Sequence, residues 1–515
     1  MTYKEALDFI STAAAPGSVY GLERIRALLD ALGNPQDSLR FIHIAGTNGK
    51  GSVSRMLACV LTAAGYRVGC FNSPCLVSPC EYLSVSDPIP SDHIESSRET
   101  PNNNTWGENI CTDGKDNALA HNYNPVAATE EEFVEEVERV RAATAVLDTV
   151  DASQDCSSAL RPTAFEYYTA MAIDFFARRS CDFAILECGL GGKDDSTNVI
   201  PSPEVAIITR IGLDHTELLG PDIASIAAAK AGIIKKGCSV IAYPSDEEAL
   251  NVIRETCVKE ACSISVADPA KLRIVHTGIL EGDSVTYDGS PKLRLSLMGA
   301  HQALNAAVVI EAVKALNDRI MISDEALRRG LAGTVWPARL TLMSTDPPVI
   351  LDGAHNPQCM SALCQSLEYI LSNMTSQDEH SSDLQTSDSD LDNTQICQGN
   401  SLKRKFLVIT GVMADKDYKD MYRTLAPYAG KVIAVRPDNP RSLEPAEIVR
   451  IFEGYGVPGV VSDSVVEALK QAKKEVIASQ DKKEPGAHTP EPLAGVVVTG
   501  SLYMMKPLLE QQDLS

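Results

Sequence analysis

Apolar runs rich in β-branched residues recur along the chain, and segments with helical spacing separate them. The first set of runs reads RFIHIAG, YRVGCF, FAILECGL, EVAIITRIG and SVIAYP, with helix-like stretches such as SRMLACVLTAAG and FEYYTAMAIDFFARR between them. Strands that alternate with helices predict an α/β fold with a doubly wound parallel sheet. Because these strands are continuously apolar, we expect helices to cover both faces of the sheet.

A second set of the same kind begins near residue 339. Its strands read PPVILDGAH, KRKFLVITGV, GKVIAVRP and GVVVTGSL, and a helical pattern follows each of them. We therefore expect two α/β domains, 1–335 and 336–515, with GTVWPARL at their junction. The length of 515 residues agrees with two or three domains.

Three polar stretches interrupt these patterns, near 96–127, 375–402 and 480–492. They contain few large apolar residues, so they bury too little surface to offset the entropy of ordering. We interpret them as surface insertions.

The charge of the chain limits its partners. Lys and Arg number 46 against 69 Asp and Glu, which gives a net charge of −23 and disfavours nucleic acid and anionic membranes. The N-terminus lacks a signal-like pattern, and no apolar run is long enough to span a bilayer. We expect a cytoplasmic protein, with a monomer as the default, whose 14 cysteines are reduced and mostly core residues.

The stretch HIAGTNGKGS, residues 43–52, follows the first predicted strand and precedes a helix. A phosphate loop needs this arrangement, because its N–H groups and the helix N-terminus then face the phosphate oxygens. The spacing departs from G-x-x-x-x-G-K-[ST]: Ile44 stands in place of the first glycine, and Gly51 separates Lys50 from Ser52. The loop alone is also compatible with an ordinary glycine-rich turn.

Polar side chains after other buried strands could hold a metal ion beside a nucleotide. Glu187 ends FAILE, and Asp214 and His215 follow EVAIITRIG. Each could instead be a solvated strand end or a helix cap. Lys230 lies among apolar residues in IAAAKAGIIKKG, where burial should lower its pKa and favour carbamate formation with CO₂. A lysine that extends to solvent is the alternative.

Eleven segments in this order resemble the motif series of the folylpolyglutamate synthase and dihydrofolate synthase family, which belongs to the Mur-type amide ligases. They are HIAGTNGKGS, FNSPCL, TAFE, LECGLGGKDDSTNVI, IGLDHTELLG, AAAKAGIIKKG, GAHQALNA, WPARL, ILDGAHNP, GVMADKDY and TGSLYMM. The resemblance covers most of the chain outside the three insertions. It implies a P-loop Mur-ligase-like N-terminal domain and a smaller Rossmann-like C-terminal domain.

The resemblance also implies roles for residues of the nucleotide site. Lys230 would be carbamylated and, with Lys50 and His355, is a candidate catalytic residue. The implied magnesium ligands, for two ions, are Ser73, Glu187, His215 and the Lys230 carbamate. The implied ATP-binding residues are Gly46, Thr47, Asn48, Gly49, Lys50, Gly51, Ser52, Asn305, Arg339 and Asp352.

The pterin-bearing substrate is expected at two further motifs. The residues concerned are Thr163, Ala164, Phe165, Glu166, Asp194, Asp195 and Ser196. The T-x-F-E and D-x-T-N elements, with Asn48, resemble the bacterial enzymes that are often bifunctional. Cys75 in place of histidine, the stretch VSPCEYLSV and Lys193 in place of arginine depart from the family pattern.

The implied reaction adds L-glutamate to dihydropteroate or to tetrahydrofolates. ATP would phosphorylate the substrate carboxylate, and the glutamate amine would displace phosphate from the acyl phosphate. Asp352, Lys416 and Asp417 lie on segments expected to face the cleft between the domains. A P-loop kinase or ATPase, and a nucleotide-binding paralogue without ligase activity, are the alternatives.

Overall fold

The computed structural model describes residues 1–14, 21–89, 123–151, 161–276, 282–379, 404–480 and 492–512. Most of each predicted insertion lies outside these ranges. Residues 123–127 of the first are described, and there the Asn124 side chain bonds to the backbone of Gly333 and Val335, at 2.7 and 2.8 Å.

Seven strands form the first sheet, in the order β3-β2-β4-β1-β5-β6-β7. All neighbours are parallel except β2 and β3. β1 lies at the centre of this order, so its carboxyl end is flanked by those of β4 and β5. The strands are β1 Arg40–Ala45, β2 Val68–Phe71, β3 Ser84–Ser86, β4 Phe183–Glu187, β5 Val205–Ile208, β6 Ser239–Ala242 and β7 Ser263–Val266.

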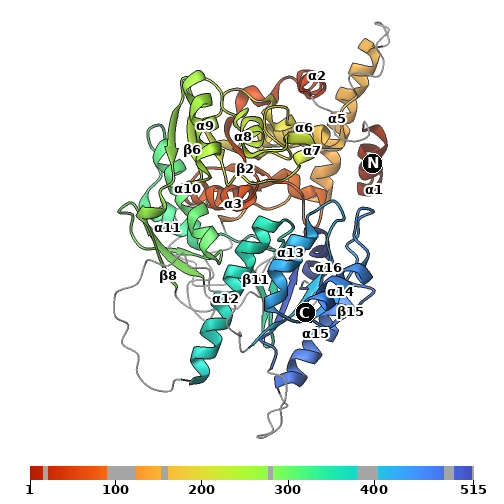
Figure 1. Cartoon of the computed structure of the whole chain (residues 1–515). Coiled ribbons are helices and arrows are strands. Elements are labelled where there is room, and N and C mark those ends of the chain that lie inside the picture. Colours follow the sequence, from red (N-terminus) through yellow and green to blue (C-terminus); the bar gives the residue numbers. More distant parts are fainter. Residues whose placement is uncertain are drawn as a thin grey trace, which may run out of the picture.

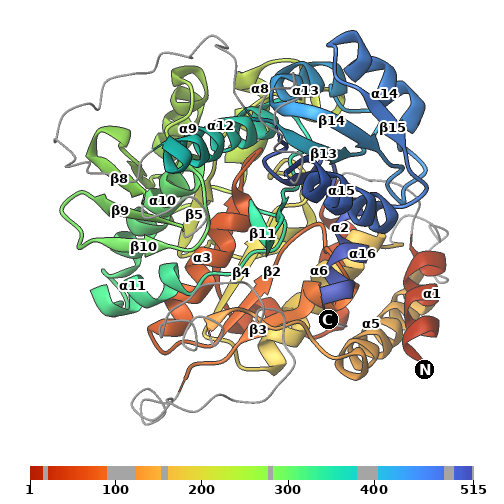
Figure 2. The same cartoon turned by 90° about the horizontal axis from the view of Figure 1, so that it is seen from below.

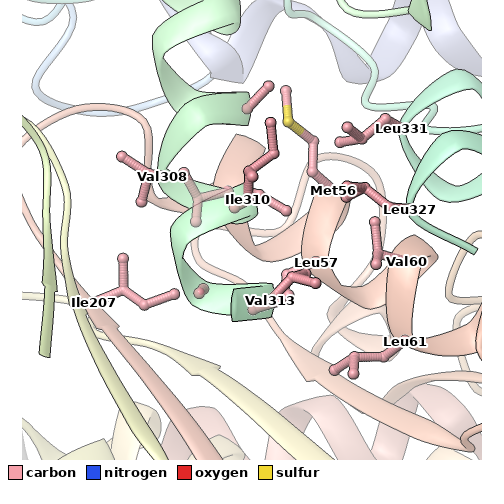
Figure 3. Packing of buried hydrophobic residues seen from close by; sticks show 14 of the residues in the cluster. Met56, Leu57, Val60, Leu61, Ile207, Val308, Ile310, Val313, Leu327 and Leu331 are labelled. Carbon is pink, nitrogen blue, oxygen red and sulfur yellow. The ribbon is translucent and has the colours of Figure 1, made fainter. Parts of the chain in front are cut away.

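Helices cover both faces of this sheet because alternate strand residues point to opposite sides. In β4, Phe183 and Ile185 face one apolar cluster, and Ala184 and Leu186 face another. The first cluster contains α3 (Lys50–Ala63), α10 (Ala300–Leu316) and α11 (Asp324–Ala332), whose side chains Figure 3 shows packed together with Ile207 of β5. The opposite face carries α1 Tyr3–Ala13, α2 Glu23–Ala31, α5 Glu130–Asp151, α6 Ala164–Arg178, α8 Ile223–Ala231 and α9 Glu247–Lys259.

A small antiparallel sheet joins this unit. Its three strands, β8 (Leu272–His276), β9 (Asp283–Tyr287) and β10 (Leu293–Leu295), pack against the cluster of α3 and α10.

Six strands form a second large sheet, in the order β11-β12-β16-β13-β14-β15, parallel except for β11. It lies below the first unit in Figure 1, and the start of α12 reaches α10 (Figures 1 and 2). α12, α13 and α14 cover one face, and α15 and α16 the other. The elements are β11 Thr341–Thr345, β12 Pro348–Leu351, α12 Pro357–Glu379, β13 Phe406–Thr410, α13 Tyr418–Leu425, β14 Ala429–Ala434, α14 Pro445–Gly454, β15 Gly459–Val461, α15 Val465–Gln480, β16 Val496–Thr499 and α16 Lys506–Gln512.

The predicted α/β class with doubly wound parallel sheets is confirmed, and all nine quoted strand segments contain a strand. The predicted boundary near residue 335 falls in the loop between α11 and β11 and stays a prediction. Every cysteine among the described residues is a free thiol. Within the same ranges, no helix combines the length and apolar character needed to cross a membrane.

Candidate active site

The glycine-rich loop connects β1 to α3 through conformations that favour glycine. Gly46 has φ +153°, and a Cβ there would lie 1.8 Å from Thr209 Oγ1. Gly49, with φ +92°, precedes the first residue of α3. A side chain at Gly46 would therefore push the loop away from β5 and displace the start of α3.

The other end of the loop is fixed to the segment after β5. The N–H groups of Thr47 and Asn48 donate to the Arg210 carbonyl, at 2.8 and 3.2 Å, and Thr47 Oγ1 bonds to the backbone of Gly212. These two N–H groups are therefore occupied. The N–H groups in the first turn of α3 have no acceptor within the helix, because no helical turn precedes them. They therefore remain available to bind an anion at the positive end of the helix.

A cavity of about 220 Å³ opens beside this loop, at the carboxyl ends of β1, β4 and β5. Ligands of open α/β sheets bind at this edge. Loops of the second unit close its far side. Its lining includes every residue predicted for nucleotide, metal or catalysis: Gly46, Thr47, Asn48, Gly49, Lys50, Gly51, Ser52, Ser73, Glu187, His215, Lys230, Asn305, Arg339, Asp352 and His355.

Lys50 and Glu187 lie together in the cavity wall. Lys50 Nζ donates to the Thr47 carbonyl at 3.2 Å and lies 3.9 Å from Glu187 Oε1. The other carboxylate oxygen, Oε2, accepts from Asn72 Nδ2 at 2.9 Å. Burial raises the pKa of Glu187, and Lys50 and Asn72 oppose that rise.

Lys230 extends from α8 to the phosphate loop. Its ammonium donates to the Gly46 carbonyl at 2.8 Å, and the residue is only 5% exposed. Burial, followed by the nearby charge of Lys50, lowers the pKa of Lys230 to about 7. A large neutral fraction is therefore present at neutral pH, which carbamate formation requires.

Asp214 and His215 border the cavity at the start of the short helix α7 (Thr216–Leu219). Asp214 Oδ1 accepts from Lys416 Nζ of the second unit at 2.9 Å. Burial favours a higher pKa for Asp214, but the bond to Lys416 and its charge lower the pKa to about 2. Burial lowers the pKa of His215, which favours a neutral imidazole able to bind a metal ion.

The second unit contributes the loop after β12. Asp352 is 8% exposed, and its two carboxylate oxygens accept from the N–H groups of Leu340 and Ala354, both at 2.9 Å. His355 Nδ1 donates to the Gly353 carbonyl at 2.8 Å, which leaves Nε2 of the neutral ring as an acceptor. Burial lowers the pKa of His355 to about 4.

The side chain of Asn48 joins the phosphate loop to the second unit. Asn48 Oδ1 accepts from Asn356 Nδ2 and from Cys359 Sγ, both at 3.0 Å, and Asn48 Nδ2 donates to Gln358. The backbone and side chain of Asn48 thus bond to other parts of the protein, although the residue lines the cavity.

A chain of hydrogen bonds connects Ser52 to α10. Gln302 Nε2 donates to Ser52 Oγ at 3.2 Å, and Asn305 Nδ2 donates to Gln302 Oε1 at 3.0 Å. The Trp336 ring covers Gly51, where a Cβ would lie 3.1 Å from the indole.

The residues predicted to bind the pterin do not line this cavity. Thr163 and Glu166 form the capping box of α6, and Arg24 pairs with Glu166 at 3.0 Å. Asp195 accepts from the N–H groups of Leu190 and Thr197. Ser196 bonds to Thr169 at 2.8 Å, Asp194 is exposed, and Ala164 and Phe165 begin α6. Two of this group contact the cavity wall from behind: the Phe165 ring lies over Gly189, and Asp195 accepts from Leu190 N at 2.8 Å.

Among the described residues, no group of three His, Cys, Asp or Glu side chains forms a metal site. The predicted magnesium ligands are not a group of this type, because they combine one carboxylate and one imidazole with a hydroxyl and a modified lysine. Glu187 offers a buried carboxylate in the cavity, and Lys230 offers an amine with a lowered pKa. Ser73 and Glu187 offer oxygen donors and Lys230 would offer them after carbamylation, so three of the four side chains suit Mg²⁺, which prefers oxygen ligands.

Sequence patterns missed several lining residues. Arg210 directly precedes the Ile211–Gly220 motif, and Gln358 and Cys359 directly follow DGAHNP, so adjacency to these motifs was the available signal. His301 and Gln302 lie within the motif GAHQALNA. Tyr243, after β6, carried no such signal.

Comparison with known proteins places these features in one family. Residues 131–313 match the Mur ligase middle domain. The dihydrofolate synthase/folylpolyglutamate synthase of Bacillus subtilis is 34% identical over 378 residues, which cover 72% of this chain and 77% of that protein. The folylpolyglutamate synthase of Lacticaseibacillus casei is 30% identical over 519 residues, which cover 98% of this chain and 97% of that protein. The structure of Mycobacterium tuberculosis folylpolyglutamate synthase complexed with ADP has a TM-score of 0.77 at 26% identity, with 99% and 98% covered.

Proposed function

The chain belongs to the dihydrofolate synthase/folylpolyglutamate synthase family, and from this premise we propose that it is an ATP-dependent ligase that adds L-glutamate to dihydropteroate, to tetrahydrofolates or to both. The observation that carries the proposal is the single cavity that contains the phosphate loop, Glu187, Lys230 and His355. The relative complexed with ADP supports ATP as the co-substrate.

The first step transfers the terminal phosphoryl group of ATP to the substrate carboxylate. The first-turn N–H groups of α3 would hold phosphate oxygens, and Lys50 would neutralise the negative charge that is shared during transfer. Such transfer depends on positioning and electrostatic stabilisation. The product is an acyl phosphate, in which phosphate is a good leaving group.

Magnesium would be held by Ser73, Glu187, His215 and the carbamate of Lys230. A bound Mg²⁺ supplies positive charge that stabilises the phosphoryl oxygens. The protein's own contribution is a buried carboxylate at Glu187 and a neutral amine at Lys230, which can take up CO₂ and release a proton.

The second step joins the glutamate amine to the acyl carbon. Water would hydrolyse the acyl phosphate, so the two units must enclose it. The bonds of Asn48 to Asn356 and of Lys416 to Asp214 hold the units together beside the cavity. Nε2 of His355 is an acceptor in the same cavity, and we assign it to accept a hydrogen bond from the attacking amine and so orient it.

The choice of folate substrate rests on motif resemblance. The T-x-F-E motif at Thr163–Glu166 and the name of the Bacillus subtilis relative support dihydrofolate synthase activity beside polyglutamate synthesis. Cys75 and Lys193 are the departures from the family pattern that bear on this choice. We also propose that the protein is a cytoplasmic monomer. Light scattering after size-exclusion chromatography tests the oligomeric state.

The deciding experiment measures ADP release from purified protein with ATP and magnesium. Dihydropteroate and tetrahydrofolate are supplied side by side, each with and without L-glutamate. We expect sustained ADP release and glutamate incorporation only when a folate acceptor and glutamate are both present. Sustained release without glutamate would instead indicate a kinase or ATPase, and nucleotide binding without turnover would indicate a paralogue that lacks ligase activity.

A further inference from the structure

The segment from Ser73 to Ser78 connects the cavity to the second unit. Ser73 and Pro74 line the cavity, two and three residues after the end of β2. Leu76 and Val77 pack against the apolar cluster on the α15 and α16 side of the second sheet. The segment therefore lines the cavity at one end and contacts the second unit a few residues later.

One carboxylate holds the backbone of this segment. Glu81 lies on the short helix η2 (Pro79–Leu83) and accepts three consecutive N–H groups. Leu76 N donates to Oε2 at 2.7 Å, and Val77 N and Ser78 N donate to Oε1 at 2.7 and 3.1 Å. Hydrogen bonds to an ionised carboxylate are stronger than those between neutral groups.

The geometry of these bonds fixes where the side chains point. Three consecutive N–H groups converge on one carboxylate only if the chain bends around it, and in this bend Leu76 and Val77 face the second sheet. The end of the segment is also fixed, because Tyr3 Oη and Ser78 Oγ lie 2.9 Å apart. Cys75 packs instead against the core of the first unit.

We propose that Glu81 is a positioning residue for the ligase reaction. It shapes residues 76–78 so that Leu76 and Val77 seat on the second sheet, and this seating sets the position of Ser73 in the cavity. The inference rests on the proposed function, in which Ser73 is a magnesium ligand, but Glu81 itself touches neither substrate nor metal.

The test compares Glu81→Gln with Glu5→Gln. Glu5 is a matched control because it closes the same kind of capping box with Thr2 on α1, away from the cavity. Glutamine keeps the size of the side chain, but it replaces one acceptor oxygen with a donor. For Glu81→Gln we expect at least a 10-fold loss of kcat and at least a 5-fold rise in the Mg²⁺ concentration for half-maximal activity. Calorimetric ATP binding without divalent ion should change less than 2-fold.

A readout that is independent of turnover is hydrogen exchange at residues 76–78, which should be at least 10-fold faster in Glu81→Gln and unchanged in Glu5→Gln. Should Glu81→Gln fail to fold, Val77→Ala decides, since it keeps the carboxylate bonds and removes a docking contact. It should show the same shift in Mg²⁺ dependence.

The proposal is overturned if the variant tested keeps kcat and Mg²⁺ dependence within 2-fold of the wild type. It is also overturned if ATP binding without metal and the urea midpoint fall together, because that pattern indicates a general structural role. If the wild type does not require glutamate, that result counts against the proposed function and not against the role of Glu81. The hydrogen-exchange measurement at residues 76–78 would still test whether Glu81 holds this segment.

Discussion

Replacing Lys230 should remove activity and increase stability. The pKa of Lys230 is lowered from 10.5 to about 7, which corresponds to at most about 5 kcal/mol of unfavourable charge burial. Lys230→Met removes that cost and also the bond to the Gly46 carbonyl, which contributes about 1–2 kcal/mol. We expect a net gain of about 2 kcal/mol in the free energy of unfolding. Structural relaxation and water penetration make the real cost of a buried charge smaller than this upper limit.

The pH dependence of this gain has a defined sign. Above about pH 10.5 the amine is neutral in both the folded and the unfolded state, so the ionisation of Lys230 costs nothing there. As the pH falls from about 10 to about 7, the unfolded state takes up a proton and the folded state does not. The advantage of Lys230→Met should therefore grow over this window and stay constant below it.

The assay is urea unfolding of both proteins in CO₂-free buffer at several pH values, together with ligase activity. The lowered pKa leaves much of Lys230 neutral near pH 7.5, whereas an ordinary lysine is almost entirely charged there, so CO₂ should restore the carbamate in the wild type. Lys230→Ala should be inactive and regain partial activity with short carboxylic acids that replace the carbamate oxygens.

Lys235→Met is the control for activity. Lys235 is also partly buried, with a pKa lowered to about 8, but its ammonium bonds to the Asn198 carbonyl at 2.8 Å, and it does not line the cavity. It should keep activity. A Lys230→Met variant that is less stable than the wild type across the whole pH range would refute the burial cost of this lysine, and a Lys230→Ala variant that keeps wild-type turnover without added acids would refute its catalytic role.

Three further changes test other parts of the site. Lys50→Ala should reduce ligase activity at least 1,000-fold with the circular dichroism spectrum unchanged, because it removes the ammonium proposed to neutralise the transferring phosphoryl group; retained turnover in steady-state assays would refute the assignment. Gly46→Ala should lose ATP binding in calorimetry because its Cβ would meet Thr209, whereas Gly454→Ala, which has open space around it, should bind normally. Lys416→Met should raise the pKa of Asp214 and weaken closure, seen as a larger radius of gyration in X-ray scattering with ATP; an unchanged radius would contradict that role for the ion pair.

Much of the fold followed from hydrophobic pattern, and the exceptions have physical causes. Long buried strands such as β1 and β13 have continuous apolar runs, so their positions were predictable. β7 alternates between exposed and half-buried residues at the edge of its sheet, and β3, β10 and β15 have three residues each, too few for a pattern to emerge. Their formation depends on neighbours that the local sequence does not reveal.

The candidate site was predictable where functional residues lie at the end of a strand, as at Gly46–Ser52 and Glu187. It was less predictable where a residue acts through distant partners. Asn48 resembled a phosphate contact in sequence, but its amide meets Asn356, which is 308 positions away. Glu81 has no distinctive local pattern beyond its capping box, and its role depends on how the chain bends before it.

The charges around the cavity explain how an acidic protein can bind a polyphosphate. The chain carries a net charge of −23, which repels anions at long range, so binding must depend on local cations. All three carboxylates in the cavity wall already have partners: Asp214 pairs with a lysine of the second unit, Asp352 accepts from two backbone N–H groups, and Glu187 accepts from Asn72 beside Lys50. The charge of Lys50 lies close enough to disfavour that of Lys230, which is part of the reason that the pKa of Lys230 falls. A bound nucleotide phosphate would relieve this repulsion, whereas carbamylation would relieve it by reversing the sign of one partner. In the proposed ligase, Lys50 would therefore contact the phosphate, while carbamylated Lys230 would hold a cation beside Glu187.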